Sequence, residues 1–177
     1  MKEYFQNKYR IPTARATWHN YCEGMYFITI CTHQHKPYFG RIVSRPGLEE
    51  NQLKLTEMGR IVKENLQQIS CHYHYAEIPV FVIMPNHIHF IIIIDSPDNP
   101  NRDVARNVST DNGKQKTISP QKGSLATVIR GFKSAITKYA RERGIAFAWQ
   151  TRFYDRIVRN QNELNAIVEY IENNPYK

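Results

Sequence analysis

Two histidines on one predicted strand are the most promising chemical feature of the sequence. The segment His87-Ile-His89 places two imidazoles two residues apart, with an apolar residue between them and an apolar run after them. Residues i and i+2 of a β-strand point to the same face, so both rings project together, as neighbouring ligands of a divalent metal ion must. The alternative is a pair of histidines at the surface or satisfied by hydrogen bonds, because unpaired polar groups on a central strand cost free energy.

The same spacing occurs twice more, so spacing alone does not identify a site. In His33-Gln-His35 the middle residue is polar, which does not fit a strand with one face in the core. The segment His72-Tyr-His74 falls where a predicted helix gives way to a strand. Both contexts favour a metal site less than the context of His87 and His89 does.

A phenol and a carboxamide share one edge of the last predicted helix. The apolar stripe of this helix consists of Leu164, Ile167, Val168 and Ile171. At about 100° per residue, Tyr170 falls about 110° from the centre of the stripe, and Asn174, four residues later, lies beside it. If the helix packs on the sheet face that carries His87 and His89, the phenol, the amide and the imidazoles converge. The alternative is a tyrosine at the rim of the core and an asparagine that ends the helix before Pro175.

The elements that must position these residues follow from hydrophobic periodicity and capping signals. Strands are expected at 25–32, 77–84, 87–95 and about 153–158, and a small hairpin pairs 39–43 with 52–55. Helices begin after Thr56, Ser124 and Asn160, and Asn160 stands in capping-box relation to Glu163. This order predicts an α+β, ferredoxin-like fold: an antiparallel sheet with two helices on one face and an additional C-terminal helix.

Length and composition favour one globular domain that spans residues 1–177, with a flexible, polar insertion at about 96–123. The 177 residues are 41% hydrophobic, which excludes wholesale disorder. A net charge of +8 together with 11 tyrosines suits a surface that holds phosphates and stacks bases. We take five basic side chains as candidate contacts to nucleic acid: Arg130, Lys133, Arg152, Arg156 and Arg159.

Three cysteines without a Cys-x-x-Cys spacing argue against a disulfide framework or a cysteine-rich zinc site. The first residues include no apolar leader, and polar residues interrupt the apolar stretch 78–94, which therefore reads as two strands rather than a membrane span. We expect a cytoplasmic protein with no membrane partner.

The motifs resemble those of a known family, the REP-associated tyrosine transposases of bacteria, which belong to the single-tyrosine HUH transposases (His, hydrophobic residue, His). Matching segments follow the family order and cover nearly the whole chain. They are 26–32, 82–89 (with Met84-Pro-Asn-His-Ile-His89), 123–125 through 132–135, 149–155, Arg159-Asn160 and 169–175.

The resemblance implies a role for each candidate residue. His87, His89 and Asn174 would bind Mg²⁺ or Mn²⁺, and Tyr170 would be the nucleophile. The family cleaves single-stranded DNA beside a hairpin, which leaves a 5′-phosphotyrosine link and a free 3′-hydroxyl, and then rejoins strands. The expected partner is therefore single-stranded DNA with a hairpin of palindromic sequence. The expected place of action is the bacterial nucleoid, where the protein acts as a monomer or a homodimer.

Three alternatives stay open at this point. Tyr154 and Tyr176 are rival nucleophiles, although neither keeps the helical relation to Asn174. The chain could be a non-catalytic single-stranded nucleic-acid-binding module, such as a decayed or domesticated transposase, because one fold hosts many functions. A metal-dependent phosphohydrolase that uses water is the third alternative.

Overall fold

The computed structural model describes residues 19–43, 52–96 and 122–174. Most of the predicted insertion at 96–123, and the rival nucleophile Tyr176, lie outside these ranges. A four-stranded sheet with the order β4-β5-β1-β6 forms the centre of the fold. Its strands are β1 (Glu23–Cys31), β4 (Ala76–Ile83), β5 (His87–Asp95) and β6 (Tyr154–Ile157), and all neighbours are antiparallel. This strand order is that of the predicted ferredoxin-like fold. A hairpin of β2 (Gly40–Val43) and β3 (Gln52–Leu55) forms a separate two-stranded sheet, as predicted.

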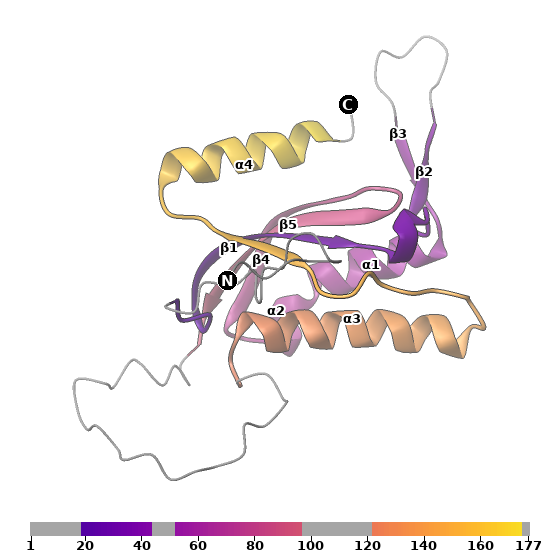
Figure 1. Ribbon diagram of the computed structural model, residues 1–177, viewed down its shortest axis with the longest axis horizontal. Helices are drawn as coiled ribbons and strands as arrows, with labels where there is room; N and C mark the ends of the chain where they lie inside the picture. Colours follow the sequence, from indigo (N-terminus) through magenta and orange to yellow (C-terminus); the bar gives the residue numbers. More distant parts are fainter. Residues whose placement is uncertain (1–18, 44–51, 97–121, 175–177) are drawn as a thin grey trace, which may run out of the picture.

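Helices cover both faces of the four-stranded sheet. In Figure 1, α1 (Glu57–Gln67), α2 (Ile69–His72) and α3 (Leu125–Glu142) lie on one side, and α4 (Gln161–Asn173) lies on the other. The three predicted N-caps are confirmed: the side chains of Thr56, Ser124 and Asn160 each accept a hydrogen bond from a backbone N–H of the first helical turn. No helix among the described residues is long and apolar enough to cross a bilayer.

The sheet separates two apolar cores. The larger core lies under α1–α3 and contains alternate residues of the central strands, such as Tyr26, Ile28 and Ile30 of β1. The smaller core joins the opposite face to α4 and is built on Val82, Ile91, Ile167 and Ile171. Since both faces are covered, β5 is apolar at every position from 90 to 94 instead of at every second one.

Two helix ends have distinctive local structure. Helix α1 ends at Gln67, and Ile69–His72 form a single separate turn. At the start of α4, the Glu163 carboxylate accepts a hydrogen bond from the backbone N–H of Arg159 at 3.0 Å, not from that of Asn160. In a usual capping box this carboxylate accepts from the N–H of the N-cap residue, whereas here it accepts from the residue before the N-cap.

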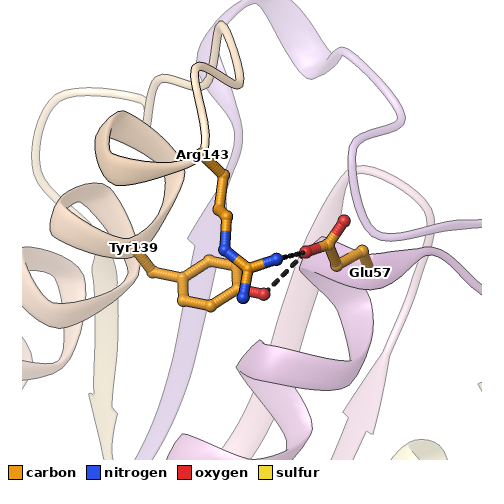
Figure 2. A network of polar contacts seen from close by, with 3 residues as sticks. All are labelled: Glu57, Tyr139 and Arg143. Carbon is orange, nitrogen blue, oxygen red and sulfur yellow. Dashed lines mark hydrogen bonds and ion pairs between the residues drawn. The ribbon is translucent and has the colours of Figure 1, made fainter.

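A polar network joins the start of α1 to the end of α3 (Figure 2). The Glu57 carboxylate accepts a hydrogen bond from the Tyr139 hydroxyl at 2.7 Å and pairs with the Arg143 guanidinium at 3.0 Å. The guanidinium also lies 5.1 Å from the centre of the Tyr139 ring. The hydrogen bond to the Glu57 carboxylate raises the pKa of the Tyr139 phenol. The network connects the two long helices that cover the larger core.

Candidate active site

The antiparallel register places the candidate residues on the sheet face beneath α4. His89 pairs directly with Thr29 of β1, and Thr29 pairs with Tyr154 of β6. His87 pairs with Cys31 in the same ladder. Residues paired directly in a sheet share one face, so both histidines, Thr29 and Tyr154 face the same side. The strand geometry predicted for His87 and His89 is confirmed.

Helix α4 brings Tyr170 against His89. The phenol oxygen of Tyr170 lies 3.3 Å from Nε2 of His89. Phe27 supports both rings: it stacks on the His89 ring at 5.4 Å and meets the Tyr170 ring edge-on at 6.1 Å. Tyr170 is 44% exposed whereas His89 is 7% exposed. A substrate at the surface can therefore reach the phenol, while the imidazole lies below it.

A second side chain holds each histidine ring through its Nδ1 atom. Nδ1 of His89 lies 2.8 Å from Oγ1 of Thr29, and Nδ1 of His87 lies 2.6 Å from Oδ1 of Asn86. An amide oxygen can only accept, so in this orientation of Asn86 the proton of neutral His87 is on Nδ1. Thr29 can accept from His89 in the same way. Both Nε2 atoms then present a lone pair, which is the form that binds a metal ion.

Burial keeps both imidazoles neutral at neutral pH. It lowers the pKa of His89 to about 4, with a smaller contribution from the nearby His87, and it also lowers the pKa of His87. The centres of the two rings are 4.6 Å apart. This donor set fits one divalent cation that accepts nitrogen ligands. Within the described ranges, no group of three or more His, Cys, Asp or Glu side chains could hold a metal. The remaining ligands would thus be amide, phosphate or water oxygens.

Asn174 lies one helical turn after Tyr170, half-buried at the end of α4. Within the described ranges, the side-chain hydrogen bonds of His87 and His89 go to Asn86, Thr29 and Tyr170 and not to Asn174. The structure therefore brings together the two histidines and Tyr170, and it leaves Asn174 nearby on the same helix.

The five basic candidates fall into two groups. Arg156 and Arg159 line a hollow together with Tyr170, and Arg152 lines a neighbouring hollow. Arg130 and Lys133 lie on α3, on the other side of the sheet (Figure 1). The Lys133 ammonium donates to the carbonyl oxygens of Gln150 and Arg152, so it fastens the segment before β6 to α3.

Three residues that contact the site were not singled out from the sequence. Phe27 and Thr29 alternate with the buried residues of β1, which marks them as facing the other side of the sheet. Asn86 lies in the turn directly before His87. The alternation could have shown which face Phe27 and Thr29 occupy, but only the register between β1 and β5 shows which histidine Thr29 contacts.

Comparison with known proteins shows the family and the fold. No family model matches the chain. A protein of Haemophilus influenzae, described as uncharacterized, is 34% identical over 166 residues, which are 91% of this chain and 86% of that protein. The chain belongs to the same family as that protein.

Two solved structures resemble the chain. A REP-associated tyrosine transposase bound to a REP hairpin has a TM-score of 0.56 and 18% identity, over 99% of this chain and 73% of that one. A candidate transposase of Deinococcus radiodurans has 15% identity over 92% of this chain and 98% of that one, but its TM-score of 0.41 is too low to establish a common fold. The first likeness confirms that the chain has the α+β fold of the REP-associated tyrosine transposases.

Proposed function

We propose that this chain is a metal-dependent single-stranded DNA endonuclease and strand transferase. It belongs to the family of the Haemophilus influenzae protein and has the fold of a REP-associated tyrosine transposase. It acts next to DNA hairpins through a 5′-phosphotyrosine intermediate. The observation that carries the proposal is the 3.3 Å contact between the Tyr170 phenol and Nε2 of His89, beside a second imidazole. The net charge of +8 and the REP hairpin bound by the structural relative support DNA as the substrate.

The proposed reaction exchanges one phosphodiester for another. The Tyr170 oxygen forms a bond to phosphorus, the bond from phosphorus to O3′ breaks, and O3′ leaves as a hydroxyl after taking up a proton. The phenol gives up one proton, so protons balance. Because the covalent link keeps the energy of the phosphodiester, a 3′-hydroxyl can attack it and rejoin strands without ATP.

His87 and His89 would hold Mg²⁺ or Mn²⁺ through Nε2, with Asn174 as the third protein ligand. When bound, such an ion neutralises charge on the phosphate and orients it. Mg²⁺ prefers oxygen ligands, so imidazoles favour Mn²⁺ in vitro. Nε2 of His89 has one lone pair, and it can accept the phenol proton or bind a cation, but not both. Thr29 and Asn86 bind the Nδ1 atoms of His89 and His87 and so keep the Nε2 lone pairs of both histidines available. Phe27 packs against the rings of His89 and Tyr170 and holds them relative to each other.

A labelled hairpin oligonucleotide with single-stranded flanks tests the proposal. With Mn²⁺, we expect cleavage and a covalent adduct on the 3′-side fragment, which peptide mapping assigns to Tyr170. Both products disappear in Tyr170→Phe. The matched control is Tyr139→Phe, which removes the same atom on α3, on the opposite side of the sheet.

Other outcomes favour the alternatives. Binding without cleavage would indicate a non-catalytic module or a decayed transposase. Cleavage without an adduct, surviving in Tyr170→Phe, would indicate hydrolysis by water. An adduct mapped to Tyr154 or Tyr176 would show that the nucleophile is assigned wrongly.

A further inference from the structure

Two hollows lie side by side next to the candidate active site, and one tyrosine lines both. The larger, of about 710 Å³, is bordered by Tyr170, Phe27, Tyr154, Arg156 and Arg159, among others. The smaller, of about 570 Å³, is bordered by residues that include Thr29, Arg152 and Tyr154. Tyr154 therefore stands between them, on the sheet face that carries the histidines.

The Tyr154 ring is available to a ligand. It is 53% exposed on the edge strand β6, one of the few large apolar side chains so exposed among the described residues. It stacks on no other ring in the described part of the chain. The structure thus leaves a flat aromatic surface beside the nucleophile, where burial in the core would have been more favourable.

The two arginines of the larger hollow, Arg156 and Arg159, differ in their ion pairing. The Arg156 guanidinium pairs with the Glu163 carboxylate at 2.6 Å. Glu163 also accepts a hydrogen bond from the backbone N–H of Arg159, and the more distant charge of the Arg159 guanidinium helps to lower the pKa of Glu163. No described carboxylate forms an ion pair with that guanidinium. Arg159 is therefore the cation of this hollow that can bind an incoming phosphate.

We propose that Tyr154 stacks on the base of the nucleotide next to the scissile phosphate, while Arg159 binds a neighbouring phosphate of the same strand. The single strand then passes from one hollow to the other across Tyr154. This inference rests on the proposed function, because it takes the phosphate that Tyr170 attacks to lie at the larger hollow, which Tyr170 borders. Aromatic stacking is tolerant of base identity, so Tyr154 adds affinity and position more than sequence preference.

Binding measured in a Tyr170→Phe background tests the inference without cleavage. A hairpin oligonucleotide with single-stranded flanks carries 2-aminopurine at each flank position in turn. We expect fluorescence quenching at one position next to the cleavage site. Tyr154→Ala should remove the quenching and weaken binding about 5- to 150-fold, the range for one base–aromatic stack. Tyr154→Phe keeps the ring and should restore both, and a thermal melt of each variant checks the fold.

Charge is tested separately. Arg159→Gln should weaken binding and reduce the slope of log K against log salt by about 0.7, as expected for one phosphate contact on a single strand. The control Arg60→Gln removes a charge from α1, on the opposite side of the sheet, and should change neither quantity.

The two levels of the proposal fail differently. If the Tyr170→Phe protein binds no single-stranded oligonucleotide, the proposed function is overturned and this inference with it. If the protein binds and the parent cleaves, but Tyr154→Ala neither weakens binding nor changes the quenching, only the stacking role is wrong.

Discussion

Replacing Thr29 with valine removes one hydroxyl from the candidate site and keeps the shape of the side chain. That hydroxyl is the partner of Nδ1 of His89 at 2.8 Å. His89 is only 7% exposed, so water cannot easily take its place. Thr29→Val therefore leaves a buried imidazole nitrogen without its partner.

The size of the effect follows from what the imidazole can do next. If the proton stays on Nδ1, the unpaired group costs about 1–3 kcal/mol of the free energy of unfolding. The ring escapes part of this cost by moving its proton to Nε2 and donating to the Tyr170 oxygen, 3.3 Å away. Nε2 then has no lone pair for a cation. We expect Mn²⁺ affinity to fall about 10- to 100-fold, which is about 1.4–2.7 kcal/mol.

Three measurements check this prediction: denaturant unfolding for stability, calorimetry for Mn²⁺ affinity, and ¹⁵N NMR of the imidazole for the position of the proton. Thr29→Ser keeps a hydroxyl and should stay near the parent. Thr137→Val removes a hydroxyl that donates to the Lys133 carbonyl on α3, far from the site, and should leave Mn²⁺ affinity unchanged. A Thr29→Val protein that binds Mn²⁺ like the parent, with Nδ1 still protonated, would refute the reasoning.

Two further predictions concern stability. Gly59→Ala should destabilise the protein, because the added Cβ would overlap the backbone carbonyl of Phe39, even though alanine is favoured over glycine in a helix by about 1 kcal/mol. In the control Gly131→Ala, the added Cβ overlaps only the tip of the Tyr73 side chain, which can move. Denaturant unfolding should therefore show a much smaller loss of stability for Gly131→Ala than for Gly59→Ala. Acidifying the metal-free protein should lower its free energy of unfolding as the pH falls from about 6.5 to about 4, since unfolded histidine takes up a proton before folded His89 does. The loss of unfolding free energy is on the order of 2 kcal/mol. His89→Asn should remove this part of the pH dependence. If the pH profile of that variant is unchanged, His89 is not the group responsible.

The parts of the fold that depend on neighbouring residues could be predicted from the sequence. The N-caps Thr56, Ser124 and Asn160 act within one turn, and the common face of His87 and His89 follows from strand geometry alone. The ferredoxin-like order followed because each element has a clear period, and the structural likeness confirms it.

Long-range placement could not be predicted from the residues. Nothing in the apolar stripe of α4 says which face of the sheet it covers, and this decides whether Tyr170 meets His89. The sequence likewise does not show that Arg130 on α3 and Arg159 beside the larger hollow lie on opposite sides of the sheet. The roles of the site residues, including Asn174, stay predictions.

The central place of β1 has a consequence for how the molecule folds. Its ladder partners belong to strands that come much later in the chain, and the contact of Thr29 with His89 spans 60 residues. The contact of Tyr170 with His89 spans 81 residues and needs α4, the last element, in place. Contacts of high sequence separation form slowly, because loop-closure entropy must be lost before they stabilise anything. A chain in which α4 has not docked therefore lacks the contact between Tyr170 and His89, so the candidate site is complete only when the last element is in place.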